Sequence, residues 1–156
     1  MSFKQHIENW MEETRVALIA EYDRQGLRAS GSYAKSLEPE ISESGSGFRA
    51  VMKSAKHAYW MQNGRRPNQT KSPEQAKMLY PIILEWVRDK GLNFGKGHVF
   101  AICLKIVYEG INVPNRHNPG GVVDNVVNRD RIDKLMSKIG AAFQEQIRSD
   151  VIKILK

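Results

Sequence analysis

Residues 36–54 read SLEPEISESGSGFRAVMKS, and this stretch decides the fold class. Two segments of strand-like composition, Ser36 to Glu43 and Phe48 to Ser54, flank the turn-forming run Ser44-Gly45-Ser46-Gly47. Two such segments joined by a short glycine-containing turn are typical of a β-hairpin. Pro39 has no backbone N–H to donate to a neighbouring strand, so it marks an edge strand or a bulge. We therefore expect a small antiparallel sheet here.

The N-terminal side of the hairpin has the periodicity of a long helix. Ser2 and Gln5 have the spacing of a capping box, and apolar residues then recur on one side of a 3.6-residue helix. Gly26 fits the left-handed position that commonly ends a helix, because a residue without Cβ takes a positive φ at no steric cost. The pattern predicts a helix from Phe3 to Arg24.

The other end of the chain predicts a second long helix. Apolar residues from Ile132 to Ile154 recur at helical spacing, with Asn128 or Asp130 as the cap. This amphipathic helix is expected to run for about 24 residues.

Shorter helices are expected between these elements. Lys56 to Gly64 predicts a short aromatic helix that ends at its glycine. Ser72 is placed as the N-cap of the next helix, which Gly91 ends and in which Pro81 predicts a kink or a restart. His98 to Glu109 fits either a helix or a buried strand, and its length and the glycine that follows favour the helix.

These elements predict an α+β fold in a single domain of residues 1–156: a small antiparallel sheet packed with long N- and C-terminal helices and shorter central helices. No apolar run reaches the roughly 18 residues that span a bilayer, and no signal-peptide pattern is present, so neither membrane insertion nor secretion is expected. The single Cys103 forms no internal disulfide and is expected to be a small hydrophobic residue of the core in a reducing compartment.

The net charge of +7 is concentrated in the middle of the chain. Residues 53–105 contain ten Lys and Arg but three Asp and Glu. The densest part, Gly64 to Lys71, is polar and has turn residues at both ends, which predicts an exposed basic loop. Such a surface attracts nucleic acid, an anionic membrane or an acidic protein, and the charge alone does not choose between them.

Motifs of catalysis, metal binding and cofactor binding are not found in the sequence. The four histidines, at positions 6, 57, 98 and 117, have no metal-site spacing, and the glycines around Lys96 do not fit a phosphate loop. We therefore expect no enzyme activity, no metal and no cofactor.

Three aromatic residues are of interest. Tyr59 and Trp60 precede Arg65 and Arg66, a composition that can stack on single-stranded nucleic acid. The favoured alternative is structural, because aromatic residues on a short helix commonly anchor it to a sheet. Tyr59, Trp60 and Trp86 are accordingly expected to be core anchors.

The order of these segments resembles the neck and tail-completion (head-to-tail connector) proteins of tailed bacteriophages. The resemblance covers about residues 50–150 and rests on three short motifs, read in order after the first helix and the hairpin. They are Ala58-Tyr59-Trp60-Met61-Gln62-Asn63-Gly64-Arg65-Arg66-Pro67, then Pro81-Ile82-Ile83-Leu84-Glu85-Trp86-Val87-Arg88-Asp89-Lys90-Gly91-Leu92, then Lys105-Ile106-Val107-Tyr108-Glu109-Gly110. The segment after the loop Asn112 to Gly121 lacks the Pro-Phe-Leu-Arg-Pro type run of one branch, so the layer of the neck or tail stays open.

The resemblance implies a noncatalytic structural protein of the virion. Such a protein assembles in the cytoplasm of the host bacterium and forms a ring with copies of itself, in contact with portal, adaptor or tail proteins. Whether the basic face would meet packaged DNA or protein stays open. The rival hypotheses are a small basic nucleic-acid-binding module and an enzyme.

A ring subunit needs protruding segments that reach its neighbours, and three segments of this chain qualify. They are the hairpin tip with Ser46, the basic loop Gly64 to Ser72 and the loop Asn112 to Gly121. The candidate interface residues in the two loops are Arg65, Arg66, Pro67, Lys71, Asn115, Arg116 and His117. We also expect the basic middle of the chain to meet the acidic residues of the first helix in a neighbouring copy.

Overall fold

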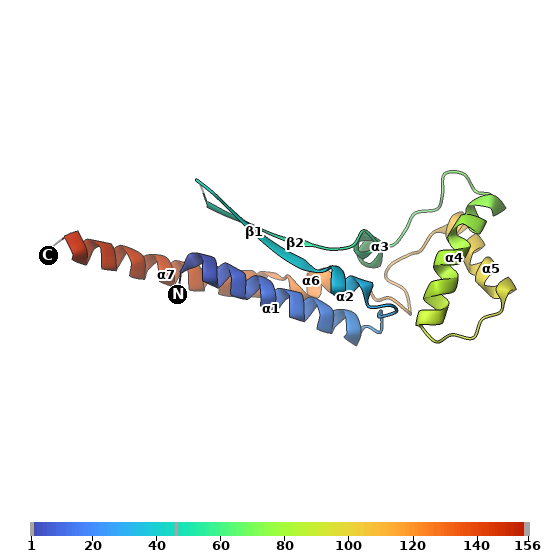
Figure 1. The fold of residues 1–156 in the computed structure, drawn as a ribbon, viewed down its shortest axis with the longest axis horizontal. Coiled ribbons are helices and arrows are strands. Elements are labelled where there is room, and N and C mark those ends of the chain that lie inside the picture. The colour runs from blue at the N-terminus through green and yellow to red at the C-terminus, as the bar shows by residue number, and fades with distance from the viewer. Residues whose placement is uncertain (1, 46, 155–156) are drawn as a thin grey trace. The chain divides into compact units, whose positions relative to one another are not determined.

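The computed structural model describes residues 2–45 and 47–154, and it has an α+β fold (Figure 1). Within these residues there are seven helices and one two-stranded antiparallel sheet. The elements are α1 (Phe3–Arg24), α2 (Ser32–Ser36), β1 (Glu38–Ser44), β2 (Gly47–Lys53), α3 (His57–Asn63), α4 (Pro73–Asp89), α5 (Lys96–Glu109), α6 (Val122–Val126) and α7 (Arg129–Ile154). The predicted fold class, with long helices at both ends, is confirmed.

The chain forms two compact units. The helix–hairpin unit comprises Met1–Glu21, Leu37–Lys53 and Val122–Lys156. The loop–helix unit comprises Tyr22–Ser36 and Ser54–Gly121. The chain therefore passes from one unit to the other four times, and the expected single domain stays a prediction.

The caps of α1 explain why its predicted bounds are correct. The backbone N–H of Ser2 donates to Gln5 Oε1 at 2.9 Å, and the backbone N–H of Gln5 donates to Ser2 Oγ at 3.3 Å. These two bonds satisfy donors that the first turn of a helix leaves without a partner. At the other end Gly26 has φ +68°, the left-handed conformation expected there.

The hairpin is confirmed, with one correction at its start. β1 and β2 pair from Glu38 opposite Lys53 to Ser44 opposite Gly47. Ser36 was predicted to begin the first strand, but it is the last residue of α2. Its hydroxyl donates to the Tyr33 carbonyl at 2.8 Å and accepts from the Ala55 backbone N–H at 2.9 Å, so it joins the segments on either side of the hairpin.

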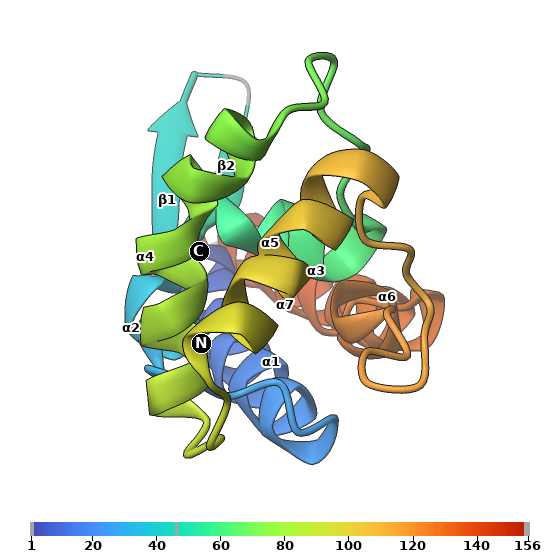
Figure 2. The ribbon, with the colours of Figure 1, turned by 90° about the vertical axis from the view of Figure 1, so that its right-hand side faces the viewer.

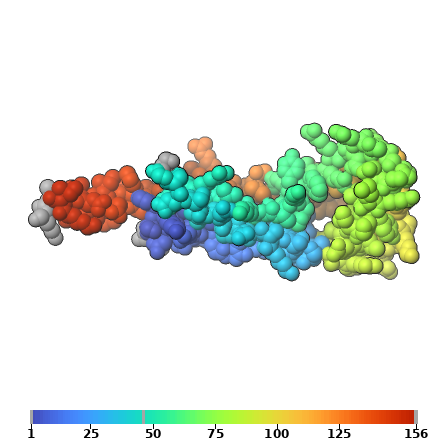
Figure 3. Space-filling model, turned by 45° about the horizontal axis from the view of Figure 1, so that its top comes forward, coloured from blue at the N-terminus to red at the C-terminus, as the bar shows by residue number. Residues whose placement is uncertain are grey.

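The helix–hairpin unit is held by contacts between α1 and the C-terminal helices. The rings of Phe3 and Phe143 lie 5.9 Å apart, and Arg131 donates to the Thr14 hydroxyl at 3.2 Å. Since Phe143 faces the first turn of α1, residues 144–154 of α7 extend beyond it (Figures 1 and 3). Asn128 accepts from the Arg131 backbone N–H at 3.1 Å and is the cap of α7, one of the two predicted.

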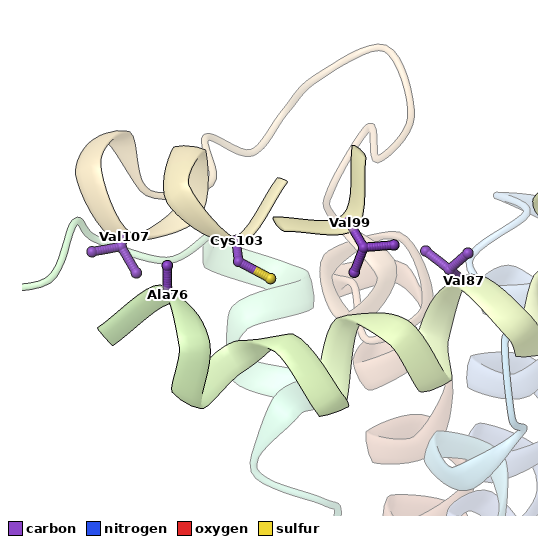
Figure 4. Packing of buried hydrophobic residues seen from close by; sticks show 5 residues of the cluster. All are labelled: Ala76, Val87, Val99, Cys103 and Val107. Carbon is purple, nitrogen blue, oxygen red and sulfur yellow. The ribbon is translucent and has the colours of Figure 1, made fainter. Parts of the chain in front are cut away.

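The core of the loop–helix unit lies between α4 and α5, which run side by side (Figures 1 and 2). Side chains from the two helices point toward one another, as Figure 4 shows: Ala76 and Val87 from α4, and Val99, Cys103 and Val107 from α5. Cys103 is fully buried, and burial raises the pKa of its thiol. Its predicted place in the core is confirmed.

Two predictions about the central helices had different outcomes. The segment from Lys96 to Glu109 is a helix, as favoured, and ends at Gly110 with φ +78°. The sequence predicted a kink or a restart at Pro81, and the restart is wrong, because α4 continues through this residue. Pro81 is exposed, so water can reach the carbonyl that the missing N–H leaves without a helical partner.

Candidate assembly interface

A backbone bridge ties the basic loop to the long loop after α5. The N–H of Arg65 donates to the Ile111 carbonyl at 2.8 Å, and the N–H of Ile111 donates to the Arg65 carbonyl at 2.7 Å. Gly64 and Gly110 flank the bridge, and each has φ +78°. A Cβ at Gly64 would collide with the Ile111 carbonyl oxygen, and one at Gly110 with the Arg65 carbonyl oxygen. Glycine is therefore required on both sides.

The basic loop is ordered by its own polar side chains. Arg65 donates to Asn68 Oδ1 at 2.9 Å, and Asn68 donates to Gln75 Oε1 at 3.3 Å. The N–H of Asn68 also donates to the Val107 carbonyl at 2.9 Å, which fixes the loop to α5. The predicted cap of α4 is present, since Ser72 Oγ accepts from the Gln75 N–H at 3.3 Å.

The long loop, residues 111–121, is built around two asparagines. Asn115 Oδ1 accepts from the backbone N–H groups of His117 and Asn118, at 2.8 and 2.9 Å. Asn118 then donates from its side chain to the Met61 carbonyl at 2.9 Å, which fixes the loop to α3. Our sequence analysis missed Asn68 and Asn118, because their side chains donate to Gln75 and Met61, which lie 7 and 57 positions away in the chain, and no local pattern indicates such bonds.

The structure therefore joins both candidate loops to α3 in one unit. Arg65 is half-buried, and the other candidates there are exposed: Arg66, Pro67, Lys71, Asn115, Arg116 and His117. Arg116 Nε donates to His117 Nε2 at 2.7 Å. Ser46, at the hairpin tip, lies outside the described residues, and the hairpin belongs to the other unit. We call the surface formed by α3 and the two loops the loop surface.

The three predicted aromatic anchors are not in the core of this chain. Tyr59, Trp60 and Trp86 are 67%, 50% and 40% exposed. The buried aromatic residues of this unit are instead Tyr22 and Tyr33, whose ring centroids lie 4.7 Å apart. Helix α3 contacts this pair through His57, whose ring lies 6.4 Å from Tyr33 in an edge contact.

Trp60 has a contact on the loop surface instead. The guanidinium carbon of Arg65 lies 5.7 Å from the centre of its ring, within the range of a cation–π interaction. Helix α3 therefore presents two exposed aromatic rings, and that of Trp60 lies next to a cation of the basic loop.

Exposed apolar residues also follow helical spacing on α4. Met78 and Ile82 are 69% and 61% exposed, and with Trp86 they occupy positions i, i+4 and i+8. This α4 stripe lies on a different side of the helix from Ala76 and Val87, which pack on α5. Helix α4 is thus apolar on two sides.

Helix α7 has a similar stripe. Leu135 and Ile139 are half-buried, whereas the other apolar positions predicted from the sequence are mostly exposed. The exposed residues of this α7 stripe are Ile132, Met136, Phe143, Ile147, Val151 and Ile154. Exposed apolar stripes of this length commonly mark surfaces that other proteins cover.

A cavity of about 430 Å³ lies between α1 and α7. Its walls include Glu13, Asp130 and Lys134, and Lys134 Nζ lies 2.7 Å from Asp130 Oδ2. Among the described residues, no group of three or more His, Cys, Asp or Glu side chains is placed to hold a metal ion. None of the helices in the described part of the chain has both the length and the apolar character to cross a bilayer.

Comparison with protein-family models, with curated proteins and with solved structures finds no match to this chain.

Proposed function

We propose that this protein is a noncatalytic structural subunit of the neck or tail of a tailed bacteriophage. In this proposal, copies of the chain form a ring that connects head and tail or completes the tail, in contact with portal, adaptor or tail proteins. The resemblance of the ordered motifs over residues 50–150 supports it. The observation that carries it is the exposure of the α4 and α7 stripes.

The apolar area that α4 leaves exposed favours an assembled state. Burial of apolar surface is worth roughly 25 cal/mol per Å², and single soluble chains rarely expose contiguous apolar patches above a few hundred Å². Helix α4 packs on α5 with one side and leaves Met78, Ile82 and Trp86 exposed on another. The exposed side of α4 is explained if another subunit covers it in the assembly.

The loop surface suits contacts with a neighbouring copy. A ring requires head-to-tail interfaces, in which one patch of each copy meets a different patch of the next. The cations Arg66 and Lys71 are exposed, and α1 contributes the exposed carboxylates Glu8, Glu12 and Glu13. Complementary charge of this kind steers association and fixes its orientation.

Binding of single-stranded nucleic acid is the second candidate. Tyr59 and Trp60 are exposed and Trp60 lies beside Arg65, which favours base stacking combined with phosphate contacts. This function gives no role to the α4 and α7 stripes, so we place it second.

The test is the mass of the purified protein in solution, at low and at moderate salt. It is measured alone, with the portal, adaptor and tail proteins encoded beside it, and separately with single-stranded and duplex DNA. We expect a ring-sized assembly, or a complex with a virion protein, that persists at moderate salt because buried apolar area is not screened. A monomer that binds only DNA, with affinity lost as salt rises, would replace this proposal with the second candidate.

A further inference from the structure

The two strands of the hairpin carry opposite charge. β1 has three carboxylates, Glu38, Glu40 and Glu43, and no cation, whereas β2 has Arg49 and Lys53 and no carboxylate. All five side chains are exposed. Lys53 pairs with Glu40 inside the hairpin, and this hydrogen bond holds the pKa of Glu40 below its usual value.

Both strands are edge strands. Among the described residues the sheet has only these two, so the outer side of each lacks a neighbouring strand. An edge presents unpaired backbone N–H and C=O groups, and an isolated hairpin is at best marginally stable in water. Pro39 removes one donor from β1, while β2 contains no proline. The hairpin can therefore be extended on either side, and most readily along β2.

The charges select how two copies would pair. Joining β2 to β2 brings Arg49 and Lys53 beside the same cations of the other copy, and joining β1 to β1 brings carboxylates together. Like charges on neighbouring strands destabilise a sheet, and opposite charges stabilise it. Only β2 against β1 places cations beside carboxylates at the new junction, as inside the hairpin itself.

We propose that the outer edge of β2 in one copy pairs with the outer edge of β1 in the next copy, so that the hairpins form a continuous antiparallel sheet between copies. Hairpins repeated in the same orientation give the order β1, β2, β1, β2, which is antiparallel at every step. The interface is head-to-tail, the type that generates a ring when its rotation closes. This inference rests on the proposed ring, and it identifies the outer edges of β1 and β2 as the surface through which neighbouring copies bind.

The faces of the hairpin support the same arrangement. The register places Pro39 opposite Met52 and Ile41 opposite Ala50, and alternate residues of a strand share a face. Phe48 lies on this apolar face too, opposite Glu43, and is exposed. In the proposed sheet the apolar faces of successive hairpins are continuous, so each copy shields the apolar residues of the next.

Cross-linking between two preparations tests the pairing. One preparation carries Ile41→Cys in β1 and the other carries Ala50→Cys in β2, and disulfide formation by oxidation is induced in each alone and in the mixture. A disulfide needs Cα atoms within about 7 Å, so it can join neighbouring strands but not the same strand of two successive hairpins, which lie about 9–10 Å apart. The wild-type protein is the control for Cys103, which is buried. We expect cross-linked dimers that join residue 41 of one copy to residue 50 of another in the mixture, and none in either preparation alone.

The outcomes separate this inference from the proposed function. An assembly of ring mass without a 41-to-50 link, or with 50-to-50 links in the Ala50→Cys preparation, overturns the inference and leaves the ring. A protein that stays monomeric, with and without the virion proteins, overturns both.

A charge-swapped variant gives a second measurement that does not depend on cross-linking. It carries Glu38→Lys, Glu40→Lys and Glu43→Lys in β1 with Arg49→Glu and Lys53→Glu in β2, so opposite charges still face each other within its hairpin. We expect the variant to assemble with itself and the wild type with itself, with mixed assemblies reduced at least tenfold below random mixing. Free mixing of isotope-labelled wild type with the variant, seen by native mass spectrometry, would contradict the proposal.

Discussion

At the scale of single residues, the glycines beside the bridge make the sharpest stability prediction. Gly110→Ala adds a Cβ that collides with the Arg65 carbonyl oxygen at φ +78°. Gly26 has φ +68°, but a Cβ added there has no atom within 4 Å. Gly26→Ala should therefore lose only the conformational cost of a left-handed alanine, about 1–2 kcal/mol. Urea unfolding should therefore show a larger loss for Gly110→Ala than for Gly26→Ala.

Gly140→Ala is the matched control for both variants. Gly140 lies inside α7, its new Cβ also meets nothing within 4 Å, and no positive φ is involved. Alanine is favoured over glycine within a helix, so this variant should gain about 0.5–1 kcal/mol. Equal losses for Gly110→Ala and Gly26→Ala would mean that the bridge does not constrain the loops.

The burial of the Cys103 thiol predicts how the free energy of unfolding depends on pH. Burial raises the pKa of its thiol in the folded state, so the unfolded state loses the proton first as the pH rises. The contribution of this group is complete below the unfolded thiol pKa of about 8.5, and it is lost as the pH rises above that value. The free energy of unfolding, measured in urea, should fall in this range.

The Cys103→Ala variant separates this effect from other groups. It should be less stable at every pH because it leaves a void in the core, but its stability should fall less between about pH 8.5 and 9.5. Burial also raises the pKa values of Tyr22 and Tyr33, so both proteins should lose stability above about pH 10. Identical slopes for the two proteins below that point would contradict the assignment.

Residues that act through the local backbone were predictable from the sequence. Ser72 and Gly26 have cap and turn roles that depend only on near neighbours in the chain, and both were assigned correctly. The anchoring aromatics were not predictable. A seven-residue helix such as α3 has no periodicity that tells which side is buried, so Tyr59 was assigned to the core and Tyr33 was overlooked.

At the scale of elements, the α4 stripe predicts a variant that fails to assemble but folds. Ile82→Glu places a charge in the middle of the stripe, where a covered surface would leave it without a partner. Losing a buried Ile alone costs about 1.5–3 kcal/mol, so assembly should weaken by a factor of at least about ten. The dissociation constant from sedimentation measures this effect.

The control and the folding check use the same helix. Lys77→Glu introduces the same side chain at an exposed position that is not part of the stripe, and it should assemble nearly as the wild type does. Thermal unfolding of the isolated Ile82→Glu chain should be close to that of the wild type, because Ile82 is exposed in it. Wild-type assembly by Ile82→Glu would show that no partner covers the stripe.

The long elements were predictable because their patterns extend over several turns. The bounds of α1 and the cap of α7 follow from apolar periodicity and capping residues together. Helices α2 and α6 have five residues each, too few for a helical period to be recognised, and neither was predicted. Ser36 was assigned wrongly for a different reason: its hydroxyl accepts a hydrogen bond from the Ala55 N–H, 19 positions away in the chain, and no local pattern indicates that bond.

At the scale of the whole molecule, the remaining question is whether the basic loop binds protein or DNA. Sequence and charge leave protein and DNA equally open, and the loop surface displays both cations and aromatic rings. Arg65 also orders the loop through Asn68 and Trp60, so changing it would confuse structure with binding. Arg66 and Lys71 are exposed and give the cleaner test.

The double variant Arg66→Glu, Lys71→Glu distinguishes the two partners by its response to salt. If these cations meet carboxylates of a neighbouring copy, assembly should weaken several-fold at low salt, and the difference should fade at moderate salt because exposed charges are screened. The control Lys77→Glu, Lys96→Glu makes the same change in net charge on α4 and α5, and it should weaken assembly less. If the cations bind DNA, assembly is unchanged, whereas the slope of log affinity against log salt falls by about two. Sedimentation and DNA titration of the same two variants therefore decide which partner the basic loop has.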